Sequence, residues 1–194
     1  MRKKYYRFFG GLLHAQENWL NRMAQKGYRL VRTEKLLYEF EPCESGQMQY
    51  RVEFIGEKAK EKAQDYRFFL EDLGYQVFYK NINLNYSVGK VRYRPWAEPG
   101  GRIATNSTTF NRELLIVGKE NDGKPFELHT SLEDKLSYCR NLRNPWLCFA
   151  LLFGFLGIMN YNIVFLVGAL LNLIIVLIYQ VQITALKREA KTKE

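Results

Sequence analysis

PWLCFALLFGFLGIMNYNIVFLVGALLNLIIVLIY, residues 145–179, is a run of 35 positions without a charged side chain. A single membrane helix needs about 20 apolar residues, so this run is too long for one crossing. Asn160, Tyr161 and Asn162 interrupt it near the middle. We therefore expect a two-helix transmembrane hairpin at 145–180, with helices at 146–159 and 163–179. Because the first helix is short enough to be a buried core helix, a hydrophobic hairpin that completes a soluble core is the alternative.

Basic residues flank the run on both sides, and the turn within it has no charge. Since loops rich in Lys and Arg stay in the cytoplasm, the pattern predicts a multi-pass protein of the cell membrane. Its soluble domain and its basic tail at 181–194 would both be cytoplasmic, because no signal peptide follows the N-terminal charges. The flanking residues are Arg140 and Arg143 before the run and Lys187, Arg188, Lys191 and Lys193 after it.

The charge balance and the cysteines narrow the classes of partner and cofactor. The net charge is +9, and a basic domain tethered to a membrane is attracted to anionic headgroups, so the lipid bilayer is the first partner expected. Nucleic acid is not needed to explain this charge. Cys43, Cys139 and Cys148 lack the paired spacing of metal ligands and are interpreted as free thiols. We expect no metal and no cofactor.

A weak internal repeat organises the soluble part. The strand patterns at 6–10 and 50–56 are each followed by a helical pattern, at 14–26 and 58–73, that ends in Gly-Tyr. Two such units predict an α+β domain with ferredoxin-like βαββαβ order, in which both helices cover one face of an antiparallel sheet. Residues 36–40 and 47–55 are expected to pair as a hairpin. In the second strand of that hairpin Tyr50, Val52 and Phe54 would point inward, and Arg51 and Glu53 would point to water.

The pattern changes after Lys80. Residues 88–96 and 112–119 read as strands, 98–109 as a polar loop, and 126–129 as a return strand after the turn signal Asn121-Asp122-Gly123. Ser131 and Asp134 resemble a capping pair for a helix at 132–142 that leads into the membrane run. The predicted divisions are a ferredoxin-like core at 1–82, a basic β extension at 83–130, a linker helix at 131–144, and then the hairpin and the tail.

The most specific motif is E-x-W-L-x-x-M-A-x-x-G-Y-x-L, which runs from Glu17 to Leu30. Together with the strands at 37–41 and 50–54 and the segment at 128–136, it resembles the bacterial family catalogued as domain of unknown function 2812. The resemblance implies the fold of the soluble domain and its membrane anchoring, and it carries no catalytic residue to this chain. The basic section at 80–126 departs from the short final strand of that family.

That basic section holds the strongest candidate site. Residues 80–112 contain six Lys or Arg side chains against one acid, Glu98. Arg92 and Arg94 would share one face of a strand, and the loop with Gly100, Gly101, Thr105, Asn106, Ser107 and Thr108 could donate hydrogen bonds to an anion. The alternative is a solvated basic edge that lies against lipid or opposes sheet aggregation. The proposed ligand- or partner-binding residues are Arg92, Arg94, Trp96, Arg102 and Arg112.

Other candidates are less specific. An aromatic stripe of Trp19, Tyr28, Tyr38, Phe40, Tyr50 and Phe54 would line a small-molecule pocket or, more commonly, form ordinary core. His14 and His129 have no nearby ligand pattern, so neither a metal site nor a Cys-His nucleophile is expected. Asn172 would hydrogen-bond within the hairpin or to a second copy of the chain.

No arrangement of acid, base and nucleophile is visible, so the leading hypothesis is not an enzyme. It is a membrane-anchored, cytoplasmic-facing binding or regulatory module that engages a partner protein or an anionic ligand. The alternatives are an enzyme that acts on a membrane-associated substrate and an accessory subunit of a membrane complex.

Overall fold

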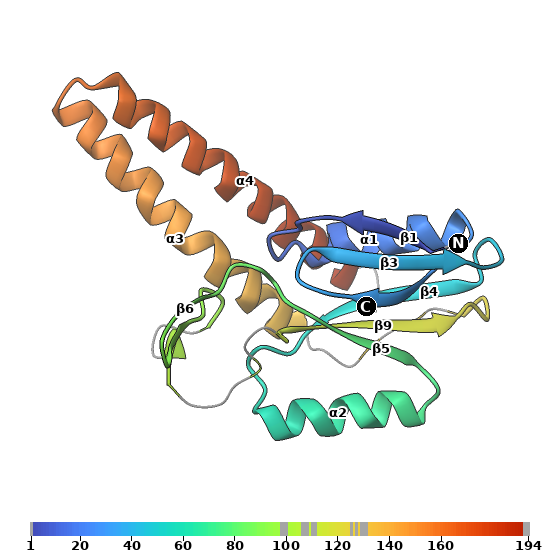
Figure 1. Ribbon diagram of the computed structural model, residues 1–194. Coiled ribbons are helices and arrows are strands. Elements are labelled where there is room, and N and C mark those ends of the chain that lie inside the picture. Colours follow the sequence, from blue (N-terminus) through green and yellow to red (C-terminus); the bar gives the residue numbers. More distant parts are fainter. Residues whose placement is uncertain are drawn as a thin grey trace. The chain divides into compact units, whose positions relative to one another are not determined.

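The computed structural model describes residues 2–97, 101–105, 109, 112–124, 126, 128 and 132–191, with the side chains of 132–134 and 189–191 left out. The chain divides into two compact units (Figure 1). Unit 1 comprises Met1–Arg94 and Pro99–Thr130, and unit 2 comprises Pro95–Glu98 and Ser131–Glu194.

Unit 1 begins with a β-α-β-β motif. Strand β1 (Lys3–Tyr6), helix α1 (Leu13–Gln25), strand β2 (Tyr28–Thr33) and strand β3 (Leu37–Pro42) follow one another along the chain. The strand order is β1-β3-β2, and both pairings are antiparallel. Strands β1 and β2 are therefore parallel, with α1 as their crossover and β3 inserted between them.

The same motif is repeated in the second half of unit 1. Strand β4 (Met48–Phe54), helix α2 (Lys60–Asp72), strand β5 (Gln76–Lys80) and strand β9 (Leu114–Glu120) form a sheet in the order β4-β9-β5, again with antiparallel neighbours. Helices α1 and α2 begin and end 47 residues apart, and each is followed by a glycine with positive φ, Gly27 and Gly74. The internal repeat in the sequence is thus a repeat of structure.

The α+β class is confirmed, but the ferredoxin-like order is not, because the strands of the two halves form separate three-stranded sheets. The predicted hairpin between 36–40 and 47–55 is wrong. Strand β3 already pairs with β1 on one side and β2 on the other, so it has no edge left for β4. In the same way β9 lies between β4 and β5 and leaves no edge for a return strand. Of the predicted return strand at 126–129, residues 127 and 129 lie outside the described residues.

The expectation of one wet sheet face is also wrong for the second sheet. Four consecutive residues of β9, Leu114 to Val117, are fully buried, so both faces of that strand are covered. On the α2 side the core comprises Ile55, Ala63, Leu70, Val77, Leu115, Val117 and Phe126. Glu53, predicted to face water, is buried there and accepts a hydrogen bond of 2.7 Å from the Tyr66 hydroxyl of α2. Leu73, which follows α2, is 54% exposed.

The chain between β5 and β9 adds a third small sheet. Strands β6 (Tyr86–Val88), β7 (Val91–Tyr93) and β8 (Ile103–Ala104) pair antiparallel in that order. The single strand predicted at 88–96 is instead a tight hairpin, which turns at Gly89, with a φ of +58°, and Lys90. We call residues 81–113 the insert.

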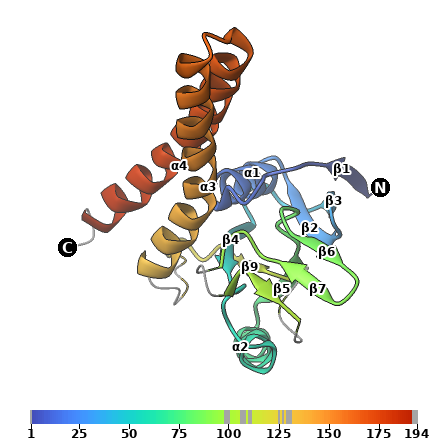
Figure 2. The same cartoon turned by 90° about the vertical axis from the view of Figure 1, so that its left-hand side faces the viewer.

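Unit 2 contains two long antiparallel helices, α3 (Leu132–Met159) and α4 (Ile163–Lys191), joined by a short turn (Figures 1 and 2). Both are long and apolar enough to cross a membrane, at 135–159 and 163–188. The predicted linker helix is the first part of α3, and Pro145 lies inside that helix. Ser131 and the Asp134 side chain, the predicted capping pair, lie outside the described residues.

The two helices of unit 2 pack through small residues. A Cβ atom at Gly157 would lie 2.6 Å from the Leu166 side chain, so only glycine allows this approach. Asn172 does not reach across the hairpin with its Nδ2, which donates to the Gly168 carbonyl of its own helix at 2.7 Å. Most Leu, Ile and Val side chains of the hairpin are exposed, as expected for a surface that faces lipid.

Candidate functional site

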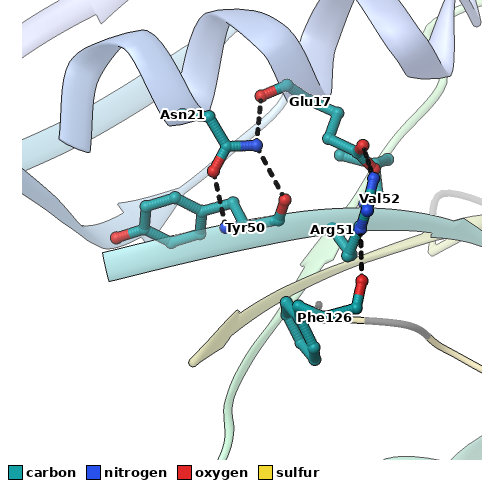
Figure 3. Close-up of polar contacts among 6 residues, drawn as sticks. All are labelled: Glu17, Asn21, Tyr50, Arg51, Val52 and Phe126. Atoms are coloured by element: carbon teal, nitrogen blue, oxygen red, sulfur yellow. Dashed lines mark hydrogen bonds and ion pairs between the residues drawn. The ribbon is translucent and has the colours of Figure 1, made fainter. Parts of the chain in front are cut away.

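Helix α1 covers the free edge of β4 with two polar side chains, one helical turn apart (Figure 3). The Asn21 side chain accepts a hydrogen bond from Tyr50 N at 2.8 Å and donates one to Tyr50 O at 2.9 Å. Glu17 Oε2 accepts from Val52 N at 3.0 Å. Because β4 is an edge strand, these bonds occupy the backbone groups that another chain would otherwise pair with. The interaction also joins the two repeats of unit 1.

Glu17 extends this junction through Arg51. Its Oε1 accepts from Arg51 Nη1, and Arg51 Nε donates to the Phe126 carbonyl at 2.6 Å (Figure 3). A further bond between the repeats runs from Leu30 N to the Tyr50 hydroxyl at 2.7 Å, and burial raises the pKa of Tyr50 to about 12. Sequence reasoning missed Glu17 and Asn21. Two polar side chains four residues apart on an otherwise buried helix face were the available signal.

Trp19 and Gly27 of the Glu17 to Leu30 motif also have structural roles. Trp19 lies at the centre of an aromatic cluster, with ring centroids 4.9 Å from Tyr38 and 5.5 Å from Phe40. At Gly27 a Cβ atom would lie 3.0 Å from the Cys43 carbonyl oxygen. The motif therefore builds the fold of unit 1.

The aromatic stripe predicted as a possible pocket is part of this core. Trp19, Tyr38, Phe40, Tyr50 and Phe54 are buried, and the rings of the first three pack edge to face. Tyr28 is half-buried, and its hydroxyl accepts from Lys3 Nζ. A hollow of about 310 Å³ lies elsewhere, over the ends of β5 and β9, and Leu73, Tyr75, Gln76 and Lys119 are among its lining residues.

The insert is attached to unit 1 through buried polar groups. Glu113 is fully buried, and its carboxylate accepts from Ile82 N at 3.1 Å and from Asn85 Nδ2 at 2.9 Å. Its own carbonyl accepts from Ile55 N at 2.7 Å. Both ends of the insert are therefore held to the β4-β9-β5 sheet.

Lys80, the first basic residue of the predicted site, is buried at the end of β5. Its Nζ donates to the carbonyls of Glu34 and Leu37 and lies 3.9 Å from the centroid of the Tyr38 ring. Burial lowers the pKa of Lys80 to about 8, against the opposing effect of Glu34. Lys80 thus ties β5 to the turn between β2 and β3.

The small β6-β7-β8 sheet has two chemically different faces. Tyr86 is opposite Tyr93, Val88 is opposite Val91, and Tyr93 is opposite Ile103. Because opposed and alternate residues share a face, these five side chains form one surface, which we call the apolar face. All five are exposed, by 40 to 79%. Sequence reasoning missed this face, although the alternation in Tyr-Ser-Val-Gly-Lys-Val-Arg-Tyr at 86–93 carries the pattern.

The predicted arginines lie on the opposite face of this sheet. Arg92 is opposite Ala104, and Arg94 N donates to the Arg102 carbonyl at 2.8 Å, which continues the ladder. Arg92, Arg94 and Arg102 are therefore together, and each is half-buried. Arg94 Nη2 donates to the Gly101 carbonyl.

Trp96 and Arg112 are not part of that arginine group. Trp96 is fully buried in unit 2, where its carbonyl accepts from Asn141 Nδ2 at 3.1 Å. Arg112 is exposed and lies 5.3 Å from the centroid of the Tyr79 ring. The loop residues Gly100, Asn106, Ser107 and Thr108 lie outside the described residues, as does Glu98.

Within the described part of the chain, no group of three His, Cys, Asp or Glu side chains could hold a metal ion. His129 is outside that part, and His14 is half-buried in α1. All three cysteines are free: Cys139 is buried, Cys43 is half-buried and Cys148 is exposed.

Comparison with known proteins supports the grouping suggested by the motif. The family model described as "Protein of unknown function (DUF2812)" matches residues 13–151, which run from the start of α1 through the second repeat and the insert into α3. Neither a curated protein nor a solved structure matches the chain. With most of its length matched, the chain belongs to the DUF2812 family.

Proposed function

We propose that this protein is a membrane-anchored binding module, whose insert engages a partner protein or an anionic ligand at the cytoplasmic surface. The observation that carries the proposal is an asymmetry between the two repeats. In the first repeat, three residues connect β2 to β3, whereas 33 residues connect β5 to β9 in the second. A three-residue turn is sufficient to close the motif, so most of the longer connection is not needed for closure and is available for binding.

The position at the membrane rests on the two helices and their flanks. Both helices have the length and the composition of membrane spans. The basic side chains at both ends of the hairpin, Arg140 and Arg143 before it and Lys187 and Arg188 after it, favour a cytoplasmic location for both flanks. Unit 1 would then face the cytoplasm.

The chemistry of the insert supports an anionic or acidic partner. Its basic side chains outnumber its acids, and Arg92, Arg94 and Arg102 are gathered on one face of a small sheet. Arginine binds carboxylate and phosphate groups through paired hydrogen bonds, which gives orientation as well as attraction.

The test is a crosslinking pull-down from native membranes with the full chain and with a variant that lacks 83–111. Because Lys80 pairs with Leu114, a short turn after Ile82 closes β5 and β9 as a hairpin, as in the first repeat. We expect a partner to be captured by the intact chain and lost with the insert. Capture of the same partner by both forms would assign binding to the helices or to the common core instead.

A charge variant tests the contribution of the basic side chains separately from that of the rest of the insert. Lys90→Gln, Arg92→Gln and Arg102→Gln together remove three charges and keep side chains of similar polarity. We expect weaker capture at higher salt for the intact chain and weak capture at all salt concentrations for the variant. Salt-independent capture by both proteins would contradict an electrostatic site.

An accessory subunit of a membrane complex is distinguished by the helices. Replacement of 145–179 by an unrelated two-helix anchor leaves a module of the proposed kind active. The same replacement abolishes capture if the helices themselves form the interface.

A further inference from the structure

We propose that the apolar face of the β6-β7-β8 sheet inserts into the boundary between headgroups and acyl chains of an anionic bilayer. This inference rests on the proposed function, because it names the membrane surface itself as the anionic ligand of the insert. It adds a second membrane contact to the two helices.

The small sheet exposes its apolar side chains and partly covers its basic ones. An antiparallel sheet with one covered face normally covers its apolar side and exposes its polar side. Here Tyr86, Val88, Val91, Tyr93 and Ile103 are exposed, while Arg92, Arg94 and Arg102 are half-buried. A contiguous group of five exposed apolar side chains indicates a surface that is covered in the working state of the protein.

The apolar face has the residue types that suit a boundary between water and lipid. The two tyrosines are opposed on β6 and β7, and three β-branched residues complete the face. Tyrosine is enriched where membranes meet water, because its ring is apolar and its hydroxyl remains hydrated. Lys90 is exposed at the hairpin turn between Val88 and Val91, where its long side chain can extend from the apolar face toward headgroups.

The positive charge of the insert is complementary to the negative charge of anionic headgroups. The insert contains five basic side chains, at positions 90, 92, 94, 102 and 112, and two acids, of which Glu113 is fully buried. An apolar surface with a basic surround is the combination that anionic interfaces bind, since burial of apolar area and attraction to headgroups act together. A hydrophobic surface on a protein partner requires no such excess of positive charge.

The chain connects the insert directly to unit 2, which contains the two long apolar helices. The chain passes from Tyr93 in β7 to Trp96, which belongs to unit 2 and whose carbonyl is bound by Asn141 of α3. Asn141 precedes by four residues the start of the charge-free run at Pro145. Only Arg94 and Pro95 separate β7 from Trp96, so the chain that links the insert to unit 2 is short.

The test compares the depth in the bilayer of two adjacent residues whose side chains lie on opposite faces of the sheet. In the full chain with Cys43, Cys139 and Cys148 changed to Ala, a single cysteine is introduced by Val88→Cys or by Ser87→Cys and labelled with an environment-sensitive fluorophore. Ser87 is the matched control, because it is also exposed and lies one position away on the opposite face. Each protein is reconstituted in nanodiscs that contain phosphatidylglycerol and a lipid with a nitroxide on its acyl chain.

We expect the probe at position 88 to emit further to the blue and to be quenched severalfold more strongly than the probe at 87. Replacement of phosphatidylglycerol by phosphatidylcholine is expected to reduce the quenching at 88. Equal, weak quenching at both positions would overturn the inference. Strong quenching at 88 that is unchanged without phosphatidylglycerol would overturn the anionic requirement.

Self-association is tested in the same samples. Energy transfer between donor- and acceptor-labelled copies at position 88, without quenching by lipid, would assign the apolar face to a second copy and overturn the inference.

The outcomes that test the proposed function differ from those that test the bilayer contact. A partner lost with the insert while position 88 stays in water leaves that function standing and refutes only the bilayer contact. A lipid-embedded position 88 without a captured partner supports the bilayer contact and refutes a protein partner.

Discussion

The side-chain amide of Asn21 exchanges two hydrogen bonds with the backbone of Tyr50, in the way that a neighbouring β-strand would. Asn21 belongs to the first repeat and Tyr50 to the second, 29 residues later. One helix side chain thus closes the edge of β4 and holds the two repeats together.

Asn21→Ala is expected to destabilise the protein by about 1–3 kcal/mol, because it leaves the N–H and the C=O of Tyr50 without these partners. The matched control is Asn18→Ala, on the exposed face of the same helix, which we expect to change stability by less than about 0.5 kcal/mol. Urea unfolding of the full chain in mild detergent measures both. Equal effects of the two substitutions would show that the edge contact contributes nothing specific.

Glu17 and Arg51 are expected to be energetically coupled by roughly 0.5–3 kcal/mol, because Arg51 bonds both Glu17 and the Phe126 carbonyl. A double-mutant cycle with Glu17→Gln and Arg51→Met measures the coupling. Glu17→Gln retains an oxygen that can accept from Val52 N, so the cycle isolates the charge pair. Additive effects of the two substitutions would mean that the pair is screened by solvent.

Gly27→Ala is expected to be more destabilising than Gly74→Ala, although the two glycines occupy equivalent places in the repeats. Both have a left-handed backbone, with φ of +78° and +83°, so each substitution costs about 1–2 kcal/mol of backbone strain. Only at Gly27 does the new Cβ also approach the Cys43 carbonyl, at 3.0 Å, whereas nothing lies within 4 Å at Gly74. Thermal unfolding of both variants gives the difference, and its absence would contradict the close contact.

Stability is expected to rise with pH between about 8 and 10 because of Lys80. Burial lowers its folded-state pKa to about 8, below the ordinary 10.5, so the unfolded chain binds more protons in this window. The rise from this one group is roughly 2 kcal/mol. Above pH 10 the raised pKa of Tyr50, about 12, acts in the opposite direction, because the folded state then retains the proton.

Lys80→Met is expected to flatten the rise between pH 8 and 10, whereas Lys90→Met, at an exposed position, leaves it intact. Denaturant midpoints measured across this pH range compare the three proteins. A rise that persists in Lys80→Met would assign the pH dependence to other groups.

The positions of the two repeat helices in unit 1 could be predicted well from the sequence, whereas the strand pairing could not, and the strand expected at 6–10 is found at Lys3–Tyr6. Helix α1 was expected at 14–26 and is found at Leu13–Gln25, since the spacing of Trp19, Leu20 and Met23 reports burial on one face of a helix. Strand β3 was assigned to the wrong partner. Its alternation is compatible with any antiparallel neighbour, and the choice of β1 and β2 depends on contacts between distant parts of the chain.

The candidate site shows the same division. Arg92 and Arg94 were predicted to share one face of a strand, and the ladder between β7 and β8 adds Arg102 to that face. The apolar face and the burial of Trp96 were not predicted. The direction in which a short strand turns its two faces depends on what covers it, and a local pattern of residues contains no such information.

By itself the sequence determined the hairpin of two long apolar helices, the repeat and the basic insert, because charge-free length, helical spacing and net charge are properties of neighbouring residues. Only the tertiary structure decided that β3 and β9 are central strands, that Glu17 and Asn21 close the edge of β4, and that the insert exposes its apolar side. These features depend on contacts between residues tens of positions apart, whose formation reflects the packing of the whole domain.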